Sequence, residues 1–307
     1  MTARHGALLA ALAAIWGASY LLIKYALEDF SPGEIVFLRT LLAALVLILV
    51  IRWQAGAAWS ELRDAPRRRP GLSLLLGFTA VAAPFLLITY GETAVPSGLT
   101  AVLIAPASLF VAAFAPFLDR SEAIDRSQAG GLVLGLVGVG LLVGVESVHS
   151  AAAFAGAMAI LAASALYALS SFVVKGPFAG VAPMTSSAIS CAGAALMTLP
   201  VAALTMSGEM PGTRALLAVA GLGIVGTALA FVIFYGLIAE IGAGRASLVS
   251  YLAPGVALFY GSVFLDEAIG VAAVVGLTLI LGGVAVAGRR RTVPVPEPAA
   301  GPAGPPG

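Results

Sequence analysis

The chain has 307 residues, of which 60% are hydrophobic and only 10% are charged; its mean hydropathy is +1.04 and its formal net charge is +1. Soluble domains carry about 25% charged residues, so this composition excludes a water-soluble globule and predicts an all-α integral membrane protein. The charged residues form no basic stripe for nucleic acid. The single cysteine, Cys191, excludes an internal disulfide and a cysteine-ligated metal site.

Ten apolar segments are long enough to cross a bilayer, which needs roughly 20 residues. In chain order they cover about 7–28, 33–52, 71–91, 97–117, 128–145, 152–174, 183–205, 213–239, 246–265 and 270–288. The arginine-rich linker 53–70 is expected to lie in water. The tail 289–307 begins with three arginines and continues in Pro, Gly and Ala, so we expect it to be disordered.

Basic residues indicate the orientation of these segments. With ten spans, both termini share one side, and all Lys and Arg residues fall on that side except Lys24, Arg39 and Arg214. Loops on the opposite side carry acidic residues instead, at Glu28, Asp29, Glu92, Glu146, Glu209 and Asp266. The positive-inside rule therefore predicts a multi-pass protein of the cell inner (plasma) membrane with cytoplasmic N- and C-termini.

Part of the sequence of the first predicted span recurs in similar form in the sixth. WGASYLLIK at 16–24 recurs as YALSSFVVK at 167–175, and Pro32 recurs as Pro183 at the same offset. Further matches in order are Tyr90-Gly91 with Tyr235-Gly236, Pro106 with Pro254, Glu122–Ile124 with Glu267–Ile269, and Gly131 and Gly138 with Gly276 and Gly283. We therefore predict two five-helix repeats, 1–145 and 146–288. An odd number of spans inverts the second repeat, a symmetry that supports alternating access.

These residues give the chain a resemblance to a known family. WGASYLLIK, the opening Pro32…Arg39 of the second span, the run 226–231 in the eighth and the run 242–247 before the ninth resemble the drug/metabolite transporter superfamily, in particular its EamA-type members. The resemblance covers about residues 7–288 and implies a secondary transporter, in a family whose substrates include amino acids, drugs and sugars. It also implies a central cavity lined by spans one, three, four, six, eight and nine, with spans five and ten as peripheral supports.

Polar and aromatic side chains within the spans are candidates for substrate binding, because polar groups in hydrocarbon usually face a cavity or a partner. Trp16, Ser19 and Tyr20 share one helical face, and Tyr167 and Ser171 repeat this pattern. The full candidate set is Trp16, Ser19, Tyr20, Tyr90, Tyr167, Ser171, Thr227, Phe231, Tyr235 and Tyr251. Helix packing and interfacial anchoring are the alternative interpretation of the same residues.

Three charged residues are candidates for a gating or structural salt bridge: Lys24, Arg39 and Glu92. Arg39 lies about two turns inside its span, where Glu34 and Glu92 are candidate partners and a substrate carboxylate is the alternative. Lys24 also has Glu28 one turn away, so a surface pair is an alternative for it. Because the acidic residues fall near span ends, the sequence gives a dedicated proton relay little support, and facilitated diffusion, exchange or coupling through the substrate stays open.

Pro106 and Pro254 fall at the middle of the fourth and ninth spans, where each proline removes a helical hydrogen bond. We expect these two prolines to act as hinges.

The sequence favours a secondary transporter that exports small organic metabolites such as amino acids or amphipathic drugs. The alternatives are a membrane channel or scramblase, and an integral-membrane lipid-modifying enzyme, for which we find no catalytic motif. The lack of a P-loop motif excludes ATP-driven pumping by this chain alone. We expect no enzymatic activity, no catalytic residue, no cofactor and no metal; the expected partners are a small-molecule substrate and the lipid bilayer, without nucleic acid, and a homo-oligomer stays open.

Overall fold

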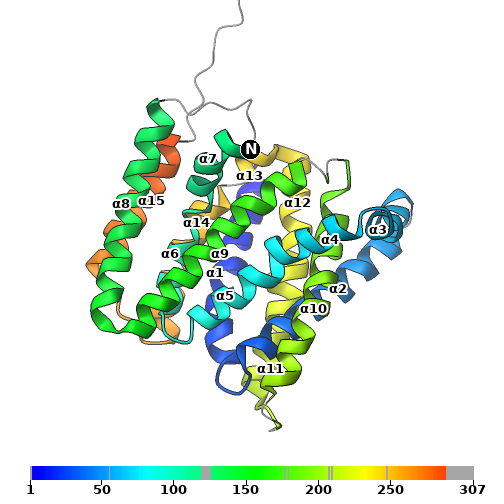
Figure 1. The fold of residues 1–307 in the computed structure, drawn as a ribbon, viewed down its shortest axis with the longest axis horizontal. Coiled ribbons are helices and arrows are strands. Elements are labelled where there is room, and N and C mark those ends of the chain that lie inside the picture. Colours follow the sequence, from blue (N-terminus) through cyan, green and yellow to red (C-terminus); the bar gives the residue numbers. More distant parts are fainter. Residues whose placement is uncertain are drawn as a thin grey trace, which may run out of the picture.

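The computed structural model describes residues 2–54, 56–118, 126–175, 178, 180–206, 208, 210–246 and 248–287. Within these ranges the chain is helical and has no strand (Figure 1). The predicted tail 289–307 and the repeat match at Glu122–Ile124 lie outside the described residues, as do Glu209 and the side chains of Glu146 and Lys175.

The first two helices, α1 (Ala3–Ala26) and α2 (Pro32–Gln54), begin at clear sequence signals. Before α2, the backbone N–H of Ser31 donates to Glu34 Oε2 at 2.9 Å, and the N–H of Glu34 donates to Ser31 Oγ at 3.2 Å. This reciprocal capping box satisfies two backbone donors at the helix start. It also engages the carboxylate of Glu34, which the sequence had offered as a partner for Arg39.

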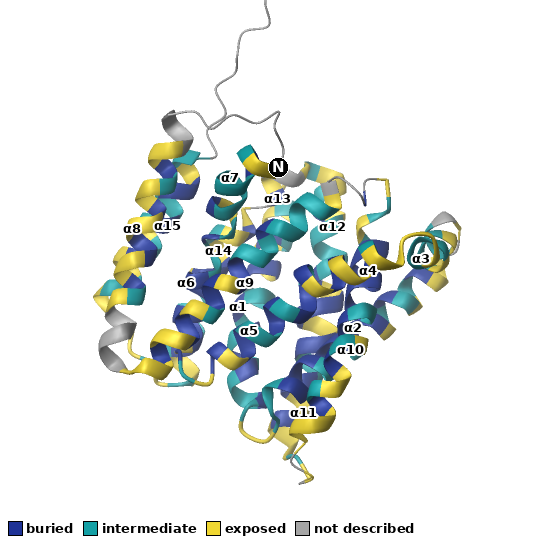
Figure 2. Ribbon diagram, viewed as in Figure 1, coloured by how far each residue is buried: buried dark blue, intermediate teal, exposed yellow. Residues whose placement is uncertain are grey.

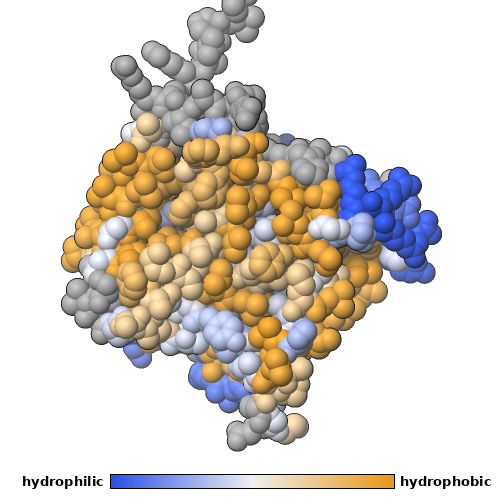
Figure 3. Space-filling model, in the orientation of Figure 1, coloured by the Kyte–Doolittle hydropathy of each residue, from blue (hydrophilic) through white to orange (hydrophobic). Residues whose placement is uncertain are grey.

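The arginine-rich linker folds as a helix, α3 (Ala57–Arg68). Its first turn carries Trp59, over whose ring the guanidinium of Arg52 lies at 5.0 Å from the centroid. Arg63, Arg67 and Arg68 remain exposed, and Figure 3 shows this part of the molecule as strongly hydrophilic beside a broad apolar surface. The polar character expected of 53–70 is therefore present in an ordered helix.

Two long helices contain a π-helical stretch at their middle. The first runs through α4 (Pro70–Gly77), η1 (Phe78–Ala82) and α5 (Ala83–Gly91). The second runs through α11 (Thr213–Ala220), η2 (Gly221–Leu229) and α12 (Ala230–Ile241). A π-helical stretch widens the helix and occurs frequently at functional sites.

The two predicted proline hinges differ in structure. Pro106 occupies a turn between α6 (Ser97–Ile104) and α7 (Ala107–Leu118), and its carbonyl accepts from the N–H of Leu109 at 2.8 Å to start α7. Pro254 lies inside α14 (Val249–Phe264), which follows the short α13 (Ala243–Ala246). The first proline thus breaks its helix, and the second does not.

Seven helices in the described ranges are long and apolar enough to cross a membrane. They span Ala3–Ala26, Pro32–Gln54, Pro70–Gly91, Ser97–Leu118, Ala151–Val174, Pro183–Thr205 and Thr213–Ile241. Shorter apolar helices, Ala129–Gly144, Val249–Phe264 and Val271–Ala287, lie where the other three spans were predicted. The structure therefore supports a multi-pass membrane protein, and the count of ten spans stays a prediction.

Helices at the edge of the molecule pack through glycine. The helices α8 (Arg126–His149) and α15 (Val271–Ala287) lie side by side at the left of Figure 1. A Cβ on Gly138 would lie 2.8 Å from the carbonyl oxygen of Gly276, so the two backbones touch where both helices lack side chains. The outer surface of α8 is exposed in Figure 2, which fits the expected peripheral position of this pair.

The remaining long helices are α9 (Ala151–Lys175) and α10 (Pro183–Thr205). The helix α10 packs along α2, and Cys191 of α10 is fully buried in the apolar cluster between them, where it is a free thiol. The helix α9 packs along α5 near the middle of the molecule. Buried residues concentrate on these inner helices in Figure 2.

Candidate functional site

A cavity of about 320 Å³ lies where helices from both halves of the chain meet. Its lining includes residues from each of the six spans that were expected to line a central cavity, namely spans one, three, four, six, eight and nine. The helix α2 contributes Arg39 in addition. The polar and aromatic members of the lining are Trp16, Ser19, Tyr20, Arg39, Phe85, Ser108, Tyr167, Thr227, Phe231 and Ser250. Small-molecule sites are typically about 300–1,000 Å³ and largely apolar with a few polar groups, which this cavity matches.

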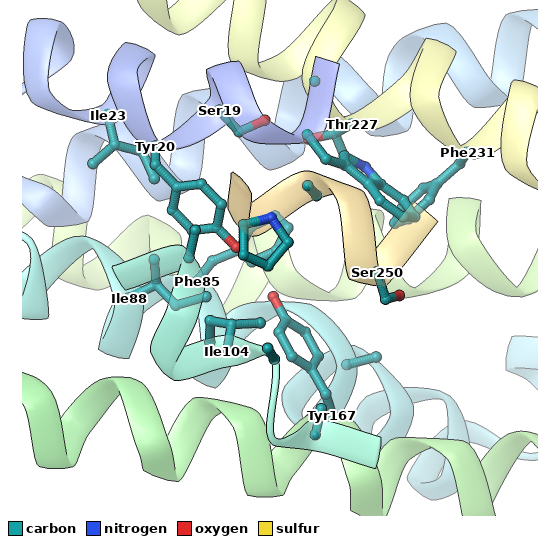
Figure 4. A pocket seen from close by; sticks show the side chains of 18 of the residues that line it. Ser19, Tyr20, Ile23, Phe85, Ile88, Ile104, Tyr167, Thr227, Phe231 and Ser250 are labelled. Carbon is teal, nitrogen blue, oxygen red and sulfur yellow. The ribbon is translucent and has the colours of Figure 1, made fainter. Parts of the chain in front are cut away.

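Two tyrosines present their hydroxyl groups to the cavity. Figure 4 shows the hydroxyls of Tyr20 from α1 and Tyr167 from α9 directed toward each other across it. Neither hydroxyl has a hydrogen-bond partner among the residues that the structure describes. Buried Tyr hydroxyls usually find a partner, so these two are available to a polar group of a solute.

Arg39 brings a positive charge to the cavity wall. Its side chain is 7% exposed, its Nε donates to Thr227 Oγ1 at 2.9 Å, and its guanidinium carbon lies 3.9 Å from the centroid of the Phe85 ring. Thr227 Oγ1 in turn donates to the carbonyl of Leu222 at 2.8 Å within η2, which fixes its lone pairs toward Arg39. The Arg39 head group is thus held by a hydroxyl and an aromatic face.

The expected salt bridge among Lys24, Arg39 and Glu92 does not form in this conformation. Among the described residues no carboxylate oxygen lies within 4.0 Å of a nitrogen of Arg39 or Lys24. Lys24 Nζ instead donates to the backbone oxygens of Glu92 and of Val95, the latter at 2.8 Å. Glu28, the alternative partner of Lys24, pairs with Arg214 at 3.1 Å.

Six of the candidate substrate residues line the cavity: Trp16, Ser19, Tyr20, Tyr167, Thr227 and Phe231. Ser19 Oγ donates to the carbonyl of Ile15 at 3.2 Å, as serine commonly does inside helices. Trp16 packs against Phe234, with ring centroids 5.2 Å apart. Of the predicted hinges, Pro254 lines the cavity and Pro106 does not.

Four candidates lie elsewhere. Tyr90 is 44% exposed on the outside of α5, and Tyr251 packs beside the apolar cluster that contains Val102. Tyr235 hydrogen-bonds Ser187 across 3.0 Å, and Ser171 Oγ donates to the carbonyl of Ala168 at 2.7 Å. Tyr90 and Ser171 occupy positions that the repeat relates to residues of the other half. Neither of them lines the cavity, so the two halves contribute to it unequally.

Sequence reasoning did not single out Phe85, Ile88 or Ile104 as part of the site. Phe85 lies directly after Pro84 and one turn past the π-helical stretch, and it forms the aromatic floor for Arg39. The proline was a visible signal of an irregular helix. An isolated phenylalanine or isoleucine in an apolar run carries no such signal, because the direction in which its side chain points depends on how the helices pack.

Comparison with known proteins shows the family and the fold of this chain. A model of the EamA-like transporter family matches the chain twice, at residues 4–144 and 154–289. The chain is 25% identical to a "Probable amino-acid metabolite efflux pump" of Salmonella typhimurium, over 92% of this chain and 94% of that protein. It is 26% identical to a "Probable terminal-alkyne amino-acid exporter" of Streptantibioticus cattleyicolor, over 90% of each chain. One solved crystal structure, at 21% identity and a TM-score of 0.65, covers 94% of this chain and 97% of its own, which shows a shared fold.

Proposed function

This chain belongs to the EamA-like transporter family, and on that basis we propose that it exports small carboxylate-bearing metabolites, amino acids among them, by alternating access. The solute sits in the central cavity, with its carboxylate at Arg39 and its polar groups at the hydroxyls of Tyr20 and Tyr167. Relatives named for amino-acid efflux and export support this substrate class.

The observation that carries the proposal is the unpaired guanidinium of Arg39 in the cavity wall. A buried charge without an opposite charge is costly, so its position requires a compensating group. Nε is used by Thr227, while the terminal amino groups have no acceptor among the described residues. A planar guanidinium with free donors matches a carboxylate, which it binds through paired hydrogen bonds.

Alternating access requires two halves that rock against each other, and we propose that the two family units are related as an inverted repeat of ten spans with cytoplasmic termini. The double match to the family and the π-helical stretch in one long helix of each half support this arrangement. Two helix pairs at matching positions of the repeats, α2 with α10 and α8 with α15, also pack on each other. We place the protein in the cell inner (plasma) membrane.

Counterflow in proteoliposomes tests the proposal. Vesicles containing the purified full-length protein are loaded with unlabelled amino acids and diluted into a ¹⁴C-labelled amino-acid mixture. A carrier that exchanges these solutes accumulates label transiently above equilibrium, and chromatography of the vesicle contents identifies the species carried. Label that only equilibrates, with no stimulation by internal amino acids, would instead indicate a channel. Vesicles that match protein-free vesicles would overturn the proposed substrate class.

A further inference from the structure

Glu92 directly follows α5 and has an unusual environment for a carboxyl group. Its side chain is 0% exposed, and neither carboxyl oxygen has a hydrogen-bond partner. Its backbone N–H donates to the carbonyl of Ile88 at 2.8 Å, so Glu92 lies one helical turn beyond a residue that lines the cavity. A carboxylate in such a place loses its hydration without compensation, and this cost is much larger for the charged form than for the neutral acid. Burial without partners therefore favours the protonated form of this carboxyl.

Charged groups surround Glu92 without pairing with it. Lys24 of α1, Glu267 after α14 and Arg39 of α2 act on it electrostatically, and Glu92 acts on the Tyr20 hydroxyl. Glu267 is engaged at the start of α6, where it accepts from the N–H of Ser97 at 2.8 Å. On the α9 side the packing against Gly91 comes from Gly156 and Ile160, which carry no charge.

Lys24 lies where it could form an ion pair with this carboxyl once the carboxyl is charged. Its ammonium is bound to the backbone oxygens of Glu92 and Val95, so it already lies on the loop that carries the acid. Loss of the proton from Glu92 would create a negative charge that attracts this ammonium and competes with both carbonyls. Because Lys24 follows Tyr20 by one helical turn, such a shift moves the part of α1 that lines the cavity.

We propose that Glu92 carries the proton whose inward movement drives export of the solute. In each cycle the carboxylate takes up one H⁺ from the outer side and releases it to the cytoplasmic side, while the solute moves outward; only the O–H bond of the acid forms and breaks. The proposal rests on the proposed function and differs from the sequence expectation, since Glu92 lies at a helix end and is nevertheless fully buried.

The test compares wild type with Glu92→Gln and Glu28→Gln in proteoliposomes. Glu28 is a matched control because it is an exposed acid, paired with Arg214. Uptake of the ¹⁴C-labelled amino-acid mixture is driven by an acidic vesicle interior, and counterflow at equal pH is measured in parallel. We expect wild type and Glu28→Gln to accumulate label above equilibrium. Glu92→Gln should lose this accumulation entirely while it retains counterflow.

Each other outcome has a defined meaning. Undiminished pH-driven accumulation by Glu92→Gln would overturn the assignment of the proton to Glu92. Wild-type counterflow without any response to the pH gradient, or with a response to a Na⁺ gradient instead, would overturn proton coupling and leave the proposed function intact. Failure of wild-type counterflow would overturn both. Should Glu92→Gln not reach the membrane, Glu92→Asp replaces it: retained pH-driven uptake with a shifted pH dependence supports the proposal, and an unshifted dependence contradicts it.

Discussion

The guanidinium of Arg39 lies over the ring of Phe85, with 3.9 Å between its central carbon and the ring centroid. An aromatic face attracts a cation and is itself apolar, so it holds Arg39 in place without neutralising it. The hydroxyl of Thr227 adds one hydrogen bond to Nε. The arrangement leaves a fixed positive charge directed at the cavity.

We predict that Arg39→Gln lowers amino-acid counterflow about 10- to 100-fold, because charge-assisted hydrogen bonds contribute about 1.5–3 kcal/mol. Arg39→Lys should also lose most activity, since an ammonium cannot stack on Phe85 and bind a carboxylate through paired donors. Arg214→Gln, which removes an exposed charge paired with Glu28, is the control and should transport normally. Equal transport by all three variants would contradict a role for Arg39 in substrate binding.

The hydroxyl of Tyr20 should contribute to affinity rather than to stability. Tyr20→Phe removes a hydroxyl that has no protein partner in the described part of the chain, so we expect substrate to bind about 2- to 10-fold more weakly at unchanged melting temperature. Tyr20→Ala should abolish transport while the protein still reaches the membrane. Binding is followed by ligand-induced thermal shift.

Tyr235 should show the opposite behaviour. Its hydroxyl hydrogen-bonds Ser187 and it lies outside the cavity lining, so Tyr235→Phe should cost about 1 kcal/mol of stability and leave substrate affinity unchanged. A loss of affinity equal to that of Tyr20→Phe would place Tyr235 in the binding site after all.

The contact between α8 and α15 predicts a position-specific effect of side chains. Gly138→Leu should destabilise the protein by about 1–3 kcal/mol, because a Cβ there meets the Gly276 carbonyl oxygen at 2.8 Å. Gly140→Leu, two residues away on the open side of the same helix, meets nothing within 4 Å and should be neutral or stabilising. Melting temperatures in detergent measure both. Equal effects would show that the two helices do not pack closely.

Glu267 is predicted to stabilise the start of α6. Its carboxylate accepts hydrogen bonds from the N–H and Oγ of Ser97 and from the N–H of Gly98, at 2.8–3.1 Å. Carboxylates at helix N-termini satisfy free donors and complement the helix dipole. Glu267→Ala should therefore lower stability by about 1–3 kcal/mol, with Glu267→Gln recovering part of it. Thermal unfolding followed by circular dichroism gives the measurement.

The topology has its own test. Alkaline phosphatase folds only outside the cytoplasm, so its fusion after Arg291 should be inactive if the C-terminus is cytoplasmic. Fusion after Pro211, in a loop predicted on the opposite side, should be active. Activity after Arg291 would place the C-terminus outside the cytoplasm, through either an odd number of spans or a reversed orientation of ten.

The sequence was informative where the signal is local. Apolar length located the helices, Pro32 marked the start of α2, and the helical spacing of Trp16, Ser19 and Tyr20 placed all three on the cavity side of α1. Conversely, Tyr90 shares its sequence neighbourhood with Tyr235, yet it faces outward. The direction of a side chain relative to other helices is a property of packing, which a single sequence does not specify.

Glu92 illustrates the same limit. By position it follows the last residue of α5, where an acid normally reaches water. Its burial arises because Gly91 lets α9 approach, so that a Cβ there would be 2.6 Å from Ile160, and because the following loop is tied down by Lys24. Both causes involve residues more than sixty positions away along the chain.

The hydrogen bond from Arg39 to Thr227 joins the first family unit to the second across the cavity wall. At the position that repeats Arg39 the second unit has Ser190, whose hydroxyl donates to the carbonyl of Ser186 at 2.7 Å within its own helix. The two units therefore contribute differently to the pocket. Among its lining residues the charged side chain is Arg39, which comes from the first unit. An anionic group of a solute inside the pocket would be oriented toward the wall that the first unit provides.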